Sequence, residues 1–226
     1  QEILTDPSYY KQIVTLTHPH IGNVGINDDD EESNRVYVSG LIIRDLSITA
    51  SNWRSENNLA EYLKKHKIVA IAGIDTRQLT RHIRKNGAMK GYIIVGSDIK
   101  IENAINKAKS FGGLVGMDLA KEVTTQTSYI WSQGVWHLKR KSTTKNKNKH
   151  RIVAYDYGIK RNILKILVDL GCEVTVVPAK YTAEEVLKEK PDGIFLSNGP
   201  GDPDACDYAI SAIKKIITTG IPVFGI

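Results

Sequence analysis

Residues 152–178 read IVAYDYGIKRNILKILVDLGCEVTVVP, and the fold of the second half of the chain follows from this stretch. The apolar runs Ile152–Tyr155 and Val174–Val177 predict two buried strands. Between them, apolar spacing predicts a helix over Asn162–Leu170, which ends at Gly171. The residues expected to face inward from this helix are Ile163, Leu167 and Leu170. The stretch therefore predicts strand, helix, strand.

The same alternation continues to the end of the sequence. Thr182 and Glu185 have the spacing of a capping box at a helix start, and Asp207–Thr219 predicts a second helix. Strands are predicted over Gly193–Leu196 and Pro222–Phe224. Continuous apolar strands joined by helices indicate a parallel sheet buried on both faces, with right-handed crossovers. We therefore expect an α/β domain of Rossmann or flavodoxin-like type over residues 152–226.

Residues 1–138 predict a separate domain of mixed α/β type. Asp75 is placed to cap one of its helices, and Gly87 to end it. The run Asp28–Glu32 predicts a solvated loop or a helix start, because metal binding would need converging ligands. The expected strands are 13–17, 36–43, 68–72 and 92–95, the expected helices are 58–66, 76–86 and 101–110, and a hairpin is expected over 129–138.

Residues 139–151 carry most of the excess positive charge. The segment reads KRKSTTKNKNKHR, with seven Lys or Arg and no acidic residue. Subtracting those seven charges from the formal charge of +6 leaves −1 for the rest of the chain. Without apolar anchors the segment predicts a basic linker. A nucleic-acid-binding tail is the alternative, but no aromatic residue is present for base stacking. Nucleic acid is therefore not the expected partner.

The amino-acid composition limits the class of protein to which the chain can belong. The 226 residues are 41% hydrophobic and 25% charged, which fits one or two globular domains. No apolar run approaches the roughly 20 residues of a membrane span, so no membrane association is expected. The two cysteines are too few for a disulfide framework. A reducing compartment, the cytoplasm, is the expected location.

Residues 197–203, SNGPGDP, follow a predicted strand and are the candidate binding loop. Ligands of open α/β sheets bind at the carboxyl ends of strands. Gly199 and Gly201 permit close backbone approach, and Pro200 stiffens the loop between them. Exposed N–H groups on a stiff loop suit an anionic or oxyanionic atom. A tight turn without a ligand is the alternative that the pattern leaves open.

The cysteines, histidines and tryptophans of the sequence do not show the pattern of a catalytic centre. Cys206 lies near a helix start, but no histidine is near it in sequence, so a structural role is expected. Cys172 is expected in the core, and the six histidines show no metal-binding spacing, so no metal site is predicted. Trp131 and Trp136 are expected to pack across the predicted hairpin.

Several stretches of the sequence match one known family. They are QEILTDP (1–7), QIVTLTHPHIGNVG (12–25), IDTRQLT (74–80), GMDLAKEV (116–123), VAYDYGIKRN (153–162), DGIFLSNGPGDP (192–203) and the final IPVFGI. On these stretches the whole chain resembles the small, glutamine-hydrolysing subunits of carbamoyl-phosphate synthetases. The SNGPGDP loop is shared by many class I glutamine amidotransferases, whereas the first 138 residues are specific to the small-subunit type.

The resemblance implies glutamine hydrolysis by a Cys–His–Glu triad. Ammonia would pass to a large subunit that makes carbamoyl phosphate with ATP, magnesium and bicarbonate, for arginine and pyrimidine synthesis. No cofactor is expected in this chain. Gly199 and Gly201 match the loop glycines that contact glutamine and help form the oxyanion hole.

The resemblance also predicts that both ends of the family's chain are missing here. The nucleophilic cysteine is expected directly after Ile226, and a serine that helps to hold glutamine is expected before Gln1. The 226 residues alone are therefore expected to be inactive. The alternative function is a non-catalytic α/β module that binds a small anion or a partner.

Overall fold

The computed structural model describes residues 1–138 and 150–226. The chain divides into two compact units: unit 1 is Gln1–Thr5 with Tyr9–Gly113, and unit 2 is Asp6–Ser8 with Leu114–Ile226. Both contain helices and parallel strands, so the predicted α/β class is confirmed. The units divide earlier than the expected end of the first domain at residue 138, because residues 114–138 pack with unit 2.

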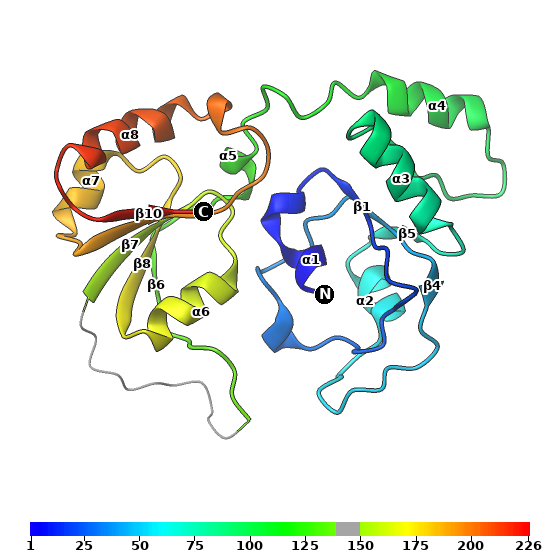
Figure 1. Cartoon of the computed structure of the whole chain (residues 1–226), viewed down its shortest axis with the longest axis horizontal. Helices are drawn as coiled ribbons and strands as arrows, with labels where there is room; N and C mark the ends of the chain where they lie inside the picture. The colour runs from blue at the N-terminus through cyan, green and yellow to red at the C-terminus, as the bar shows by residue number, and fades with distance from the viewer. Residues whose placement is uncertain (139–149) are drawn as a thin grey trace. The chain divides into compact units, whose positions relative to one another are not determined.

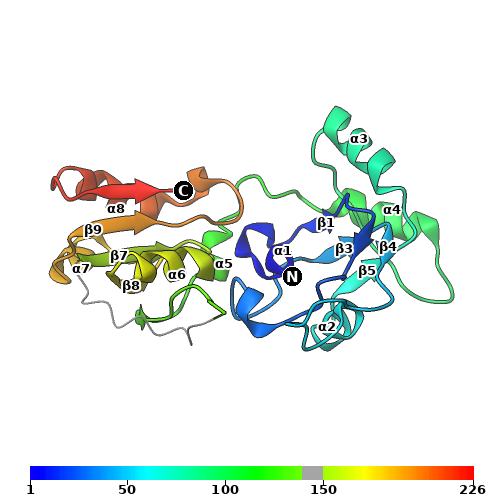
Figure 2. The same cartoon turned by 60° about the horizontal axis from the view of Figure 1, so that its bottom comes forward.

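Unit 1 is built on a three-stranded parallel sheet with the order β1-β3-β5, beside a two-stranded parallel sheet of β2 and β4. Its elements, visible in Figures 1 and 2, are α1 (Glu2–Thr5), β1 (Ile13–Thr15), β2 (His20–Ile21), the 3-10 helix η2 (Asp28–Asp30), β3 (Gly40–Ile42), β4 (Asp45–Leu46), α2 (Leu59–Lys65), β5 (Val69–Ile71), α3 (Thr76–Asn86) and α4 (Ile101–Ser110). A further 3-10 helix, η1 (Pro7–Tyr9), spans the two sets of residues.

The predicted helix signals of unit 1 are confirmed. The Asp75 carboxylate accepts a hydrogen bond from the Gln78 N–H at 2.9 Å and so caps α3, which ends at Gly87. The acidic run opens η2, and its Asp30 lies 3.0 Å from the Arg54 guanidinium. The core of the unit buries apolar residues of α2 and the sheet, including Leu41, Leu59, Tyr62 and Leu63.

The predicted strand at Tyr92–Val95 is wrong. These residues adopt no regular secondary structure. The half-buried Ile93 instead packs by its side chain: a Cβ built on Gly40 would lie 3.0 Å from the Ile93 Cδ1. The apolar pattern here reflects packing against a strand, without the backbone pairing that defines one.

Unit 2 is a five-stranded sheet with the order β10-β9-β7-β8-β6. Strands β7 to β10 pair in parallel, as predicted, while β6 pairs antiparallel with β8. The elements are α5 (Ala120–Val123), β6 (Tyr129–Trp131), β7 (His150–Asp156), α6 (Arg161–Asp169), β8 (Cys172–Pro178), α7 (Ala183–Lys188), β9 (Gly193–Leu196), the 3-10 helix η3 (Pro203–Ala205), α8 (Asp207–Ile217) and β10 (Val223–Gly225).

Alternate residues of β7 supply the two faces of this sheet. Val153 and Tyr155 pack with α7 and α8, whereas Ala154 packs with α6 on the other side (Figure 1). The residues of α6 that are fully buried are Leu164 and Val168. The expectation that Leu170 faces inward is wrong: it is 70% exposed, because α6 ends at Asp169 and Leu170 is its C-cap.

The predicted hairpin over Tyr129–Leu138 is also wrong. Its first strand, β6, adds to β8 instead, with Trp131 opposite Val174. The free edge of β8 offers unpaired N–H and C=O groups, and pairing there satisfies more backbone than a short hairpin could. Trp131 packs against the core on the α6 side, and its Nε1 donates to the Gln133 carbonyl at 2.7 Å.

The predicted linker ends two residues too late. His150 and Arg151 already belong to β7, where they pair with Cys172 and Glu173 of β8. Residues 139–149 lie outside the described residues.

Candidate functional site

The strand order of unit 2 contains a topological switch point, and the carboxyl edge of the sheet there is the candidate site. β8 and β9 lie on opposite sides of β7, so the winding direction reverses between β7 and β9. Ligands of open α/β sheets bind at this switch point, outside the carboxyl ends of the strands. The turn after β7 and the Ser197–Pro203 loop after β9 both begin at that edge, since Tyr155 pairs with Leu196. The predicted loop therefore lies where the topology favours a site.

The Ser197–Pro203 loop presents unused backbone donors. Gly199 and Gly201 are exposed, and neither N–H donates a hydrogen bond to any residue in the two described ranges. Pro200 between them is buried and fixes the backbone. The loop thus offers N–H groups to solvent from a stiff backbone, as an oxyanion-binding site requires.

The two glycines are required for different reasons. Gly201 has a φ of +80°, a conformation that disfavours side chains. Gly199 does not, but a Cβ built on it would lie 2.2 Å from the Tyr157 carbonyl oxygen. The sequence suggested that both glycines admit a ligand closely. In the structure, the absence of a side chain at Gly199 makes room for the protein's own backbone at Tyr157.

Asp156 shapes the turn against which Gly199 packs. Its Oδ1 accepts hydrogen bonds from the N–H groups of Gly158 and Ile159 at 2.9 and 2.8 Å, and its Oδ2 accepts from the Thr125 N–H at 2.7 Å. The side chain is buried, and this burial raises its pKa above the usual value even though the three donors favour the carboxylate. Asp156 therefore fixes the turn that supports the loop.

Ser197 and Asn198 tie the start of the loop to that turn. The Tyr157 N–H donates to the Ser197 Oγ at 2.9 Å, and the Ser197 Oγ donates to the Asn198 carbonyl at 2.7 Å. The Asn198 carboxamide accepts from the Lys160 N–H at 3.3 Å and donates to the Gly158 carbonyl at 3.0 Å. The two segments form one hydrogen-bonded assembly.

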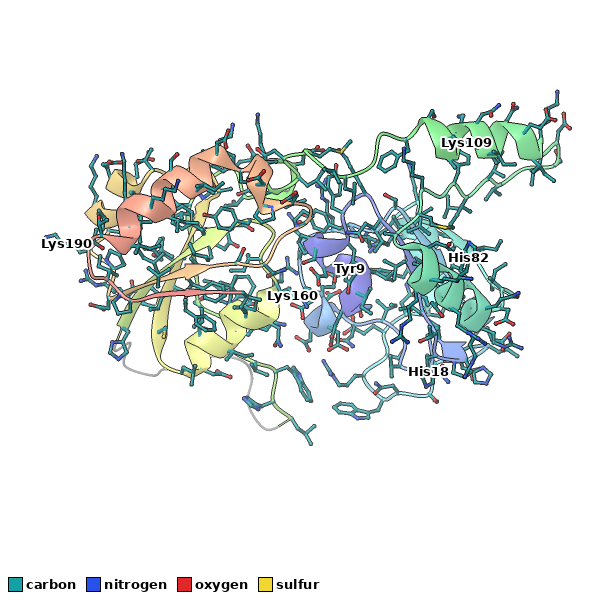
Figure 3. All side chains as sticks on the ribbon, turned by 45° about the horizontal axis from the view of Figure 1, so that its top comes forward. Tyr9, His18, His82, Lys109, Lys160 and Lys190 are labelled. Atoms are coloured by element: carbon teal, nitrogen blue, oxygen red, sulfur yellow. The ribbon has the colours of Figure 1, made fainter. Side chains whose placement is uncertain are left out.

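Residues 6–8 join the same assembly. The Asn198 Nδ2 donates to the Ser8 Oγ at 2.9 Å, and the Asp6 Oδ2 lies 3.1 Å from the Lys160 Nζ. Lys160, labelled in Figure 3, is the N-cap residue of α6. The Asp6 carboxylate is almost fully buried, with 5% of its side chain exposed, so this ion pair anchors the segment to unit 2.

The two cysteines lack the features of a nucleophile. The Cys206 thiol is buried, and its Sγ lies 3.5 Å from the Asp118 Oδ1, which also accepts from the Tyr208 hydroxyl at 3.1 Å. Burial, with the nearby Asp118 charge, raises the pKa of Cys206, and burial raises that of Cys172. Both geometries agree with the structural roles that the sequence suggested.

Elsewhere the described residues offer little further chemistry. A pocket of about 520 Å³ in unit 1 has a largely apolar wall, with Leu16, Ile21, Leu41 and Leu59 among its residues. Over residues 1–138 and 150–226, no cluster of three or more potential metal ligands is found. Among the helices of these same ranges, none has the length and apolarity to cross a bilayer.

Two family models match the chain. The model described as carbamoyl-phosphate synthase small chain, CPSase domain, matches residues 1–93, and the model described as glutamine amidotransferase class-I matches residues 153–226. The carbamoyl phosphate synthase small chains of Pectobacterium atrosepticum, Yersinia pseudotuberculosis and Escherichia coli strain K12 are 63%, 62% and 60% identical to all of this chain. Over its whole length the chain is therefore similar to carbamoyl-phosphate synthase small chains, and both family models agree with that similarity. It spans 60%, 59% and 60% of the length of these three relatives.

The sequence pointed to Gly199 and Gly201 but missed the residues that hold them. Asn198 belongs to the predicted binding loop, but no role was predicted for it, for Asp156 or for Ser8. One signal was available: Asp156 directly follows a predicted parallel strand, and the ends of such strands share one edge of the sheet. No local pattern could have brought Ser8 to Asn198, because 190 residues separate them.

Proposed function

We propose that the protein containing these residues is the glutamine-hydrolysing subunit of a carbamoyl-phosphate synthetase. It would release ammonia from glutamine and deliver it to a large subunit. The observation that carries the proposal is the pair of exposed N–H groups at Gly199 and Gly201 on a stiff loop, neither of which bonds to any described residue. The names of the matching family models and relatives, among them glutamine amidotransferase class-I, support the same reaction.

The reaction would use the loop as an electrostatic stabiliser. A cysteine thiolate attacks the side-chain amide carbon of glutamine, and the carbonyl oxygen becomes an oxyanion. The N–H groups of Gly199 and Gly201 would hydrogen-bond substrate and oxyanion, which lowers the barrier in a preorganised site. The amide nitrogen is protonated and leaves as ammonia, and water then cleaves the thioester to give glutamate and the free thiol.

The end of β10 lies beside this loop. Gly225 pairs with Leu196, and the Ile226 N–H donates to the Leu196 carbonyl at 3.2 Å. A residue that follows Ile226 would leave the sheet at the same edge as Ser197. The proposed nucleophile, a cysteine directly after Ile226, would therefore begin close to the donors that its reaction needs.

The remaining requirements are assigned to the partner. ATP, magnesium and bicarbonate would bind to the large subunit, and this chain would need no cofactor. We place the complex in the cytoplasm, which matches the two unpaired cysteines.

The decisive test is to read the gene beyond Ile226 and express the extended protein. A cysteine at the next position, glutamine-dependent release of glutamate, and loss of that release on replacing this cysteine with serine would support the proposal. The 226-residue chain serves as the inactive control. Stoichiometric hydrolysis by that chain, or a different residue after Ile226, would contradict the mechanism. The second outcome would favour a module that only binds.

A further inference from the structure

Asn198 connects three separate parts of unit 2 through one side chain. Its Oδ1 accepts from the Lys160 N–H at 3.3 Å, and its Nδ2 donates to the Gly158 carbonyl at 3.0 Å and to the Ser8 Oγ at 2.9 Å. The residue directly precedes Gly199, whose N–H is unbonded among the described residues. The side-chain hydrogen bonds of Asn198 thus reach Ser8 and the turn at Gly158–Lys160, which support the loop.

We propose that Asn198 is a positioning residue that preorganises the Gly199–Gly201 loop for the amide oxygen of glutamine. The inference rests on the proposed function. Asn198 acts through the loop, by fixing it to Ser8 and to the turn at Gly158–Lys160, and has no assigned contact with the substrate.

The other contacts of the loop cannot replace this bridge. The Ser197 Oγ accepts from the Tyr157 N–H, but this fixes the chain one residue earlier. Gly199 and Pro200 are limited by packing against Tyr157 and Gly158, which prevents approach in one direction only. Hydrogen bonds from Asn198 supply restraint in the directions that packing leaves free. Without them, the loop must be ordered at the expense of binding energy.

The effect of the Asn198 hydrogen bonds on loop order can be separated from their effect on global folding. Asn198, Ser8 and Lys160 are all half-buried, so water can replace the bonds to Ser8 and Lys160, whereas Gly158 is buried and its carbonyl loses a partner. A modest cost in global stability and a larger loss of loop order are therefore expected from Asn198→Ala. A residue needed only for folding would show the opposite ratio.

The first measurement uses the 226-residue chain and requires no catalysis. Backbone amide relaxation by NMR should give Gly199 and Gly201 order parameters near those of the strands, and below about 0.6 in Asn198→Ala. Values for Val153, Ala154 and Tyr155 of β7 should not change. Asn86→Ala is the matched control, because among the described residues its carboxamide bonds only to His82 of α3. Unchanged glycine values, or an equal loss of order in β7, would overturn the proposal.

The second measurement uses the extended, glutamine-hydrolysing protein. Asn198→Ala should lower kcat/KM for glutamine by roughly tenfold to hundredfold, with an increase in KM. Asn198→Asp keeps an acceptor for the Lys160 N–H but sets an oxygen against the Gly158 carbonyl, and should lose as much. Ser8→Ala should lose less, and the double variant should lose less than the product of the two effects.

These outcomes separate the two proposals. A fall in kcat at constant KM, in proportion to folded protein, would assign Asn198 a structural role and contradict the positioning role. An unmodified extended protein without glutamine hydrolysis would refute the proposed function, and the NMR result would still decide whether Asn198 orders the loop.

Discussion

Two turns leave the same edge of the unit 2 sheet, and they differ in how their polar groups are used. In the turn after β7, the N–H groups of Gly158 and Ile159 are bonded to Asp156, and the residues are buried. In the loop after β9, the N–H groups of Gly199 and Gly201 are exposed and, within the described residues, unbonded. The N–H groups of the first turn are hydrogen-bonded within that turn, and the second turn is held in place by its hydrogen bonds to the first. Donors can stay free on a stiff loop because a neighbouring segment provides the stiffness.

Gly199→Ala should break this arrangement most severely. The new Cβ would lie 2.2 Å from the Tyr157 carbonyl oxygen, so one of the two backbones must move. Backbone cannot rotate away as a side chain does, and overpacking of this kind costs about 3 kcal/mol. Urea unfolding of the purified chain should show that loss in the free energy of unfolding.

Gly112→Ala is the control for this substitution. Gly112 has no positive φ, and a Cβ there would meet no atom of the described residues within 4 Å. Its free energy of unfolding should change by less than about 0.5 kcal/mol, or rise slightly. Equal effects at the two positions would show that Gly199 does not pack closely on Tyr157 in solution.

Asp156→Asn should weaken the turn after β7, whose hydrogen bonds Asp156 accepts. The asparagine oxygen can still accept from Gly158 and Ile159, but its NH2 group would face the Thr125 N–H. Leaving that half-buried donor unpaired should cost about 1 kcal/mol, to be measured by urea unfolding at neutral pH. A variant as stable as the original would mean that the third bond is not made.

The pH dependence of this difference has a defined sign. Burial raises the pKa of Asp156, so the folded chain holds its proton more tightly than the unfolded chain, where the pKa is about 3.9. The stabilisation that comes from this tighter proton binding is complete below the unfolded-state pKa. It is lost as the pH rises through the raised pKa of the folded state. Because asparagine does not titrate, the deficit of Asp156→Asn should be larger near pH 4 than at pH 7.

The sequence could predict the sheet but not the support of the site. Short-range patterns located β7, β9 and the loop glycines, because strand periodicity and glycine spacing are local properties. The same patterns failed at Tyr92–Val95 and at the hairpin, where distant backbone decided which segment pairs. The contact of Asn198 with Ser8 depends on tertiary packing alone, and local rules carry no information about it.

Gly201→Ala should have the smallest effect and so separates the two glycines of the loop. Its strain comes from a φ of +80°, which costs an alanine about 1 kcal/mol, and the nearest atom to a new Cβ is the Leu119 Cδ1 at 3.3 Å, on a side chain that can shift. Gly171→Ala, with a φ of +88° and no described atom within 4 Å, measures the strain alone. Equal losses of unfolding free energy at Gly201 and Gly171 would mean that the Leu119 side chain shifts to make room for the new Cβ. The backbone of Gly201 would then be limited by its φ alone. A loss at Gly201 as large as at Gly199 would instead mean that both halves of the loop rest on rigid neighbours.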